Sequence, residues 1–234
     1  MIRILAALVA SWLLLWLYNR KDLAVLGLVP SKKRVRDLLV GLLVSAIFCA
    51  ADLLSIAVIT QTRLTLNNQF TTITFFVSLW WTLKSVLFEE FIFRGALLYI
   101  AIQKLGIRLA CIISAVAFGI YHWFSYEVFG DPIKMILIFI TTGIGGLMFA
   151  YAFASTKSLY LPIGLHFGWN LVTIVVFSQG PLGQQLLTIT NGQKLPAVLS
   201  ILFFLFQVLA LPLFTYWYVR RQRTATANKK FVPV

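Results

Sequence analysis

The sequence predicts an all-α fold, a polytopic membrane helix bundle of seven to eight helices. The chain has 234 residues, of which 60% are hydrophobic and 12% are charged, whereas soluble domains carry about 25% charged residues. Its apolar residues gather in segments of roughly 17–25 residues, the length that a helix needs to cross a bilayer. No long polar region interrupts them, so we expect residues 1–234 to form a single membrane-embedded domain.

Seven spans are expected from these apolar segments. We expect the first to be an uncleaved span rather than a removable signal, because only Arg3 precedes it, most nearby basic residues follow it, and no small-residue cleavage site stands before them. The stretch 95–105 either continues the third span or forms a separate short helix, which gives the count of eight. The polar residues 220–234 are expected to form a disordered cytoplasmic tail. The predicted spans are 2–18, 38–59, 72–93, 108–126, 133–154, 159–178 and 197–219.

The placement of basic residues predicts the orientation of the chain. The net charge is +13, but most of the Lys and Arg residues flank apolar segments on the side of the loop 19–37. Under the positive-inside rule this side is cytoplasmic, which puts the N-terminus outside and the C-terminus in the cytoplasm. Basic residues that flank apolar spans indicate that the partner of the chain is a lipid bilayer, and they argue against a nucleic-acid-binding protein. Cys49 and Cys111 lie in apolar runs and predict buried thiols rather than a disulfide.

Two adjacent acids inside the third apolar span are the strongest functional signal. An ionised carboxylate inside a membrane is costly and usually faces a cavity with a function. Glu90 and Arg94 are four residues apart and share a helix face, so we expect Arg94 to neutralise Glu90. Glu89 points about 100° away around the helix and stays free for chemistry. The alternative is that both acids pair with basic groups only to fix helix packing.

The two histidines of the chain, His122 and His166, also lie in apolar spans. A lone histidine in such a span is more often a packing residue than a catalyst, but here both accompany the intramembrane glutamates. A hairpin that turns near Gly106 brings Glu90 and His122 to the same depth, roughly 24 Å from the turn. His166 shares a helix face with Asn170, and helix tilt is needed to bring it to that depth.

These residues form three motifs that a known membrane family shares. They are EExxxR at Glu89, Glu90 and Arg94, FxxxH at Phe118 and His122, and HxxxN at His166 and Asn170. All three are complete and stand on separate predicted helices. The chain therefore resembles the CPBP family, the CAAX prenyl proteases and bacteriocin-processing enzymes, also called the Abi family. The resemblance covers a core of about residues 75–178.

The resemblance implies an intramembrane endopeptidase that hydrolyses peptide bonds of membrane-associated or peptide substrates. Glu89 would activate water together with His122, while His166 and Asn170 would hold the oxyanion or help to bind a metal. Glu90, Arg94 and Phe118 would support the site. Substrates of such a family are peptides or proteins, in some cases prenylated or leader-bearing. Peptide hydrolysis needs a base for water and a donor for the oxyanion, and these residue types supply both.

A metal remains an alternative for this chemistry. Glu89, His122 and His166 are sufficient ligands for a catalytic zinc ion, but the HExxH pattern of many zinc peptidases is absent. We favour the mechanism that requires no cofactor. Two other functions stay open: a non-proteolytic protein of the same fold, such as a bacteriocin immunity factor or a scaffold, and a proton-coupled transporter. The transporter ranks last because the chain shows no repeated halves.

Overall fold

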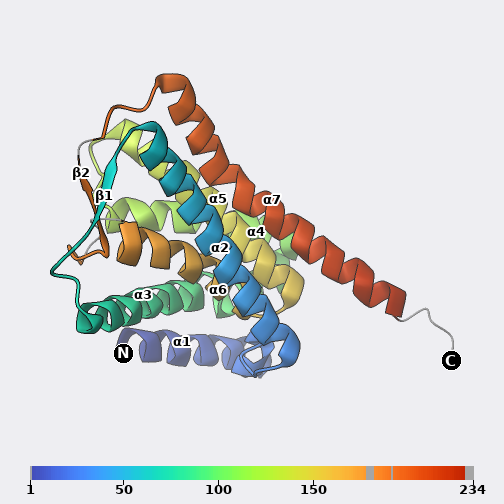
Figure 1. Cartoon of the computed structure of the whole chain (residues 1–234). Helices are drawn as coiled ribbons and strands as arrows, with labels where there is room; N and C mark the ends of the chain where they lie inside the picture. Colours follow the sequence, from blue (N-terminus) through green and yellow to red (C-terminus); the bar gives the residue numbers. More distant parts are fainter. Residues whose placement is uncertain (1, 178–181, 191, 230–234) are drawn as a thin grey trace.

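The computed structural model describes residues 2–177, 182–190 and 192–229, which form a bundle of helices with one small sheet (Figure 1). The all-α class is confirmed. The elements are α1 (Ile2–Asn19), the 3-10 turn η1 (Leu23–Leu26), α2 (Lys32–Ile59), β1 (Arg63–Leu66), α3 (Thr72–Phe93), α4 (Ala96–Ser125), α5 (Pro132–Thr156), α6 (Tyr160–Asn170), the π-helix η2 (Leu171–Phe177), β2 (Leu187–Thr190) and α7 (Ala197–Lys229).

Within these described residues, six stretches are long and apolar enough to cross a membrane. The sequence predicts seven spans, and the difference arises because α3 and α4 follow each other with almost no interruption and count as one stretch, Thr72–Ser125. The chain is an integral membrane protein. The predicted span 159–178 corresponds to α6 and η2, and residue 178 itself lies outside the described residues.

Short polar side chains fix where three of the long helices begin. The side chains of Ser31, Thr71 and Asp131 accept hydrogen bonds from backbone amides at the first turns of α2, α3 and α5. Such caps satisfy amides that have no partner inside the helix. Helix α3 begins at its predicted boundary and α5 one residue before its own, whereas α2 begins six residues before residue 38, because its cap rather than hydropathy decides its start.

Gly106 divides α4 into two helical segments. Its φ of 78° and ψ of 164° are not helical, and a positive φ is favourable mainly for glycine. The stretch 95–105 is thus a separate helical segment, as one of the two alternatives predicts. The break lets residues 107–125 leave the direction of the first segment and carry His122 back toward α3.

A small antiparallel sheet joins β1 to β2, with Arg63 opposite Thr190 and Leu66 opposite Leu187. The sequence analysis does not predict it, because strands of four residues show too little alternation to be recognised. The sheet connects the segment before α3 with the segment before α7 (Figure 1). It therefore ties together parts of the chain that are more than one hundred residues apart.

The end of α7 differs from the predicted disordered tail. Residues 220–229 continue the helix, and residues 230–234 lie outside the described residues. Polar side chains near this end bind the neighbouring helices: Tyr218 and Gln222 donate hydrogen bonds to Asp37 at 2.8 and 2.7 Å, and Arg223 donates one to Ser155 at 2.9 Å. These partners on α2 and α5 stabilise a segment that hydropathy alone marks as a free tail.

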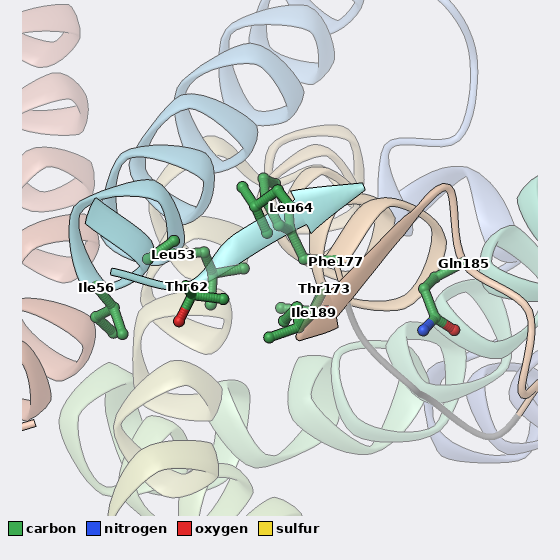
Figure 2. A pocket seen from close by; sticks show the side chains of 9 residues that line it. Leu53, Ile56, Thr62, Leu64, Thr173, Phe177, Gln185 and Ile189 are labelled. Carbon is green, nitrogen blue, oxygen red and sulfur yellow. The ribbon is translucent and has the colours of Figure 1, made fainter. Parts of the chain in front are cut away.

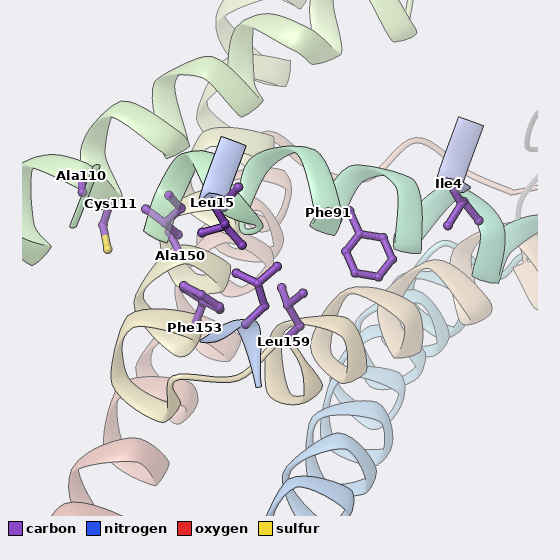
Figure 3. Packing of buried hydrophobic residues seen from close by; sticks show 11 residues of the cluster. Ile4, Leu15, Phe91, Ala110, Cys111, Ala150, Phe153 and Leu159 are labelled. Atoms are coloured by element: carbon purple, nitrogen blue, oxygen red, sulfur yellow. The ribbon is translucent and has the colours of Figure 1, made fainter. Parts of the chain in front are cut away.

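A cluster of buried apolar side chains holds α3 against α1, α4 and α5 (Figure 3). Phe91 of α3 lies in this cluster together with Ile4 and Leu15 of α1 and Leu159 before α6. Packing of this kind, rather than expulsion of water, drives helix association in lipid. Because Phe91 follows the two glutamates directly, the cluster fixes the rotation of α3 about its axis.

Helices α2 and α6 approach each other closely through glycines. A Cβ at Gly164 would collide with the Leu38 carbonyl group, and a Cβ at Gly168 would collide with the Leu42 carbonyl oxygen and the Ser45 hydroxyl. Small residues allow membrane helices to pack with their backbones in contact. Gly164 and Gly168 flank His166, so the same contact determines where that histidine lies.

We expect Gly164→Ala to lower both stability and activity, because α6 must move away from α2 to admit the methyl group. The cost of such overpacking is about 1–3 kcal/mol. Thermal unfolding of the detergent-solubilised protein measures it. Gly145→Ala on α5 is the matched control, since the nearest atom to its added Cβ lies at 4.0 Å. Equal melting temperatures for the two variants would contradict the close α2–α6 contact.

Candidate active site

Glu90 and Arg94 form a fully buried ion pair at the end of α3, and neither residue is exposed. The Arg94 guanidinium donates from Nε to Glu90 Oε2 at 2.6 Å and from Nη2 to Glu90 Oε1. This confirms the pair predicted from their spacing. His166 of α6 adds a third partner, with its Nδ1 at 2.7 Å from Glu90 Oε1. Glu90 therefore connects two helices.

Aromatic rings enclose this ion pair. The Arg94 guanidinium carbon lies 4.2 Å from the ring centre of Phe118, 5.1 Å from that of Phe149 and 5.6 Å from that of Phe93. A guanidinium is attracted to the faces of aromatic rings at such distances. The Phe118 ring also contacts the His122 ring, with ring centres 4.4 Å apart. Phe118 thus contacts both the buried cation and one histidine of the site.

The two oxygens of the Glu89 carboxylate have different surroundings. Oε1 accepts a hydrogen bond from the Ser85 hydroxyl, one turn earlier on α3, at 3.4 Å. Oε2 is buried and has no hydrogen-bond partner among the described residues. It faces both histidines, at 3.9 Å from His122 Nε2 and 3.7 Å from His166 Nε2. Residues from α3, α4 and α6 therefore meet at this oxygen.

The protons on the two imidazole rings follow from their partners. His122 Nδ1 lies 2.8 Å from the Phe118 carbonyl oxygen, and His166 Nδ1 lies against the Glu90 carboxylate. Both partners are acceptors, so each Nδ1 carries the hydrogen. In the neutral rings each Nε2 then has a free lone pair directed to the side of Glu89. The other nitrogen of each ring, Nδ1, is fixed by its hydrogen bond to the protein, as in histidines that orient water or a metal.

Asn170 is the last residue of α6 and is half-buried, one turn beyond His166. The π-helix η2 starts at the next residue, Leu171. In η2 the Thr173 hydroxyl donates hydrogen bonds to the carbonyl oxygens of Trp169 and Asn170, at 3.2 and 3.3 Å. Single π-helical turns in α-helices are frequent at functional sites.

Two residues of the site are missing from the sequence prediction. Ser85 could have been found from its position, four residues before Glu89 on the same helix face. Phe149 of α5 stacks on the His166 ring, with centres 4.8 Å apart and planes inclined by 17°. No sequence signal distinguishes Phe149 from the other aromatic residues of its span, because only tertiary packing places it there.

The donor atoms of the site match a catalytic zinc set in type but not in arrangement. A carboxylate and two imidazole lone pairs face one another, as zinc requires. Within the part of the chain that the structure describes, however, no three His, Cys, Asp or Glu side chains are grouped closely enough to share a metal ion. Removal of divalent metal ions, described below, tests whether Glu89, His122 and His166 bind zinc.

Comparison with known proteins agrees with the motifs. Residues 70–172 match the model of the family described as type II CAAX prenyl endopeptidase Rce1-like. The matched region runs from just before α3 to the start of η2 and contains all three motifs. The comparisons with curated proteins and with solved structures each found no match. This match covers less than half of the chain and is consistent with its resemblance to the CPBP family.

Proposed function

We propose that this protein is an intramembrane endopeptidase in which Glu89 activates water for attack on a peptide bond of a membrane-associated or peptide substrate. One observation supports this most strongly. The unpartnered Glu89 Oε2 is buried opposite the two Nε2 atoms of His122 and His166. A water molecule beside these atoms can donate one hydrogen bond to Oε2 and the other to an imidazole lone pair.

In the proposed reaction Glu89 acts as the general base. It takes a proton from water as the water oxygen attacks the carbonyl carbon, and the carbonyl oxygen becomes an oxyanion. The Asn170 amide is a suitable donor to this oxyanion. The proton held by Glu89 then passes to the leaving nitrogen, directly or through His122, as the C–N bond breaks. The products are a carboxylic acid, which gives its proton to the released amine, and that amine, while the carboxylate of Glu89 is regenerated.

Glu90, Arg94 and Phe118 support this chemistry without touching the substrate. Glu90 orients His166 through Nδ1, and a protonated His166 would be paired with the Glu90 carboxylate. In that form its Nε2–H can join Asn170 as a donor to the oxyanion. Arg94 compensates the negative charge of the buried Glu90 carboxylate, because a buried carboxylate without a partner is costly. The rings around Arg94 exclude lipid and water from the pair.

We expect hydrolysis to survive removal of divalent metal ions, since the chain lacks the HExxH pattern of many zinc peptidases and we favour the mechanism that requires no metal. The measurement is the cleavage rate of a reporter peptide by purified protein before and after prolonged treatment with 1,10-phenanthroline and EDTA. The rate should stay within about twofold of its starting value. A loss of activity that added zinc restores would instead assign Glu89, His122 and His166 as ligands.

The substrate class is tested in cells. Peptides of the membrane and the medium are compared between cells that carry the wild-type protein and cells that carry Glu89→Gln. A peptide that accumulates uncleaved only in the variant identifies the substrate, whether prenylated or leader-bearing. An immunity phenotype that is unchanged in Glu89→Gln would favour the non-proteolytic alternative.

We also propose the predicted orientation, with the N-terminus outside and the C-terminus cytoplasmic. Protease accessibility of tags at the two termini tests this orientation.

A further inference from the structure

One cavity of the structure has no part in the chemistry described above. It is a cavity of about 500 Å³ between the end of α2, the β1–β2 sheet and η2 (Figure 2). Volumes of roughly 300–1,000 Å³ are typical of ligand sites. Its lining is mostly aliphatic and aromatic and includes Leu53, Ala57, Phe177 and Ile189, and none of the lining residues is charged.

One polar group in this cavity lacks a partner. Gln185 lines the cavity and is only 5% exposed, and its side-chain oxygen Oε1 has no hydrogen-bond partner among the described residues. The other polar side chains of the lining are already bonded to the chain: Thr62 to the Thr60 hydroxyl at 2.7 Å, and Thr173 to two backbone carbonyls of α6. A buried acceptor without a donor is costly, so the cavity suits a ligand that is apolar and brings one N–H or O–H donor.

The cavity is connected to the active site by a continuous helix. Thr173 lines it and stands seven residues after His166 and three after Asn170. At about 1.5 Å rise per residue, Thr173 lies roughly 10 Å beyond His166 along the helix axis. An extended peptide advances about 3.3 Å per residue. A substrate bound at Glu89 in extended form can thus reach the cavity with a residue about three positions from the bond that is cut.

We propose that this cavity is a substrate subsite that binds a bulky apolar side chain about three residues from the scissile bond, with a substrate backbone N–H donating to Gln185 Oε1. The proposal rests on the peptidase function proposed above. A peptide satisfies both demands of the cavity at once, because it offers an apolar side chain and a backbone donor next to it. The hydrocarbon of a lipid chain fills the apolar part and leaves Gln185 unpaired.

The test uses the full-length protein in detergent micelles and a pool of end-capped octapeptides randomised at every position. Mass spectrometry of the products gives the residue preference at each position around the cut. Wild type should prefer Leu, Ile or Phe at one position about three residues from it. Ala57→Trp fills the cavity and should reduce that preference about tenfold or more, as expected for a filled apolar pocket, while the other positions stay unchanged.

Matched variants separate the cavity from general damage. Val58→Trp adds the same side chain at the next residue of α2, which is 77% exposed, and should keep the wild-type profile. Leu53→Ala enlarges the cavity and should shift the preference toward larger side chains, which provides a test if Ala57→Trp does not fold. Gln185→Leu should raise KM about tenfold at unchanged kcat, and Gln185→Glu, which keeps an acceptor oxygen, should raise it less.

A binding measurement distinguishes failure of this proposal from failure of the proposed function. Glu89→Gln retains the cavity, so immobilised Glu89→Gln protein should capture apolar peptides from the pool, and the additional change Ala57→Trp should release them. Capture without any cleavage by wild type would overturn the peptidase function and keep the subsite. If Ala57→Trp leaves the residue preference of cleavage unchanged, the subsite is overturned. It is also overturned if a copurified lipid is lost in Ala57→Trp while the residue preference stays the same.

Discussion

Glu89→Gln is expected to lower kcat about 10³-fold, because general acid–base catalysis contributes roughly 10²–10⁴-fold. The amide has the shape of the carboxylate and can still accept the Ser85 hydrogen bond at Oε1, but it cannot take a proton from water. The position of the substrate is unaffected, so KM should change little. Single-turnover cleavage of a reporter peptide by purified protein measures the loss, and the melting temperature shows that the fold is retained.

Glu127→Gln is the matched control for this experiment. Glu127 is the remaining glutamate of the chain and is exposed in the turn after α4. Its substitution changes the net charge by the same amount and should leave kcat unchanged. Cleavage by Glu89→Gln at the rate of the Glu127→Gln protein would remove Glu89 from the mechanism.

Arg94→Met is expected to destabilise the protein by about 3–5 kcal/mol, which is the usual cost of leaving one member of a buried ion pair without its partner. Glu90 would remain buried with His166 as its main partner, among the rings that enclosed the guanidinium. Arg94→Lys should rescue little, because a lysine cannot donate to both carboxylate oxygens in a fork. Unfolding of the purified protein by denaturant in detergent micelles measures the change.

A double variant separates stability from catalysis. Glu90→Gln combined with Arg94→Met removes both charges and should recover part of the lost stability. Its kcat should stay below that of wild type, because His166 Nδ1 loses the carboxylate that orients the imidazole ring. Lys134→Gln, which breaks the exposed pair between Lys134 and Asp131 at 3.1 Å, serves as the control and should unfold like wild type. Unfolding of Arg94→Met at the wild-type midpoint would contradict the importance of the buried pair.

Local spacing predicts part of the site from the sequence. The Glu90–Arg94 pair depends on residues one turn apart on one helix, and the helical period is sufficient to find it. The hairpin near Gly106 also brings α4 back to α3. Its depth estimate brings Glu90 and His122 to the same level but does not say which acid faces the ring; in the structure this acid is Glu89, as the resemblance implies. The estimate has no information on helix rotation, which the contacts of Phe91 determine.

The remaining features depend on contacts between distant segments. The bond from His166 to Glu90 joins residues 76 positions apart, and it requires that glycines let α6 lie directly on α2. The stacking of Phe149 on His166 also depends on contacts between distant segments, and so does the β1–β2 sheet. Hydropathy predicts that a segment crosses the membrane, and it contains no information on which neighbour the segment touches. The assignment of catalytic roles stays a prediction that the variants above can test.

The local nature of the Glu90–Arg94 pair also bears on how the chain enters the bilayer during synthesis. The two residues are one turn apart, so the pair can close as soon as this stretch becomes helical, without a contact from any other helix. The turn then enters the lipid as a nearly neutral unit, which reduces the insertion cost of two charges. Glu89 has its facing partners on α4 and α6, which are synthesised later. Glu89 therefore meets the two histidines, and Glu90 meets His166, only after these later helices are in place, so the proposed catalytic centre is complete only after the bundle has assembled.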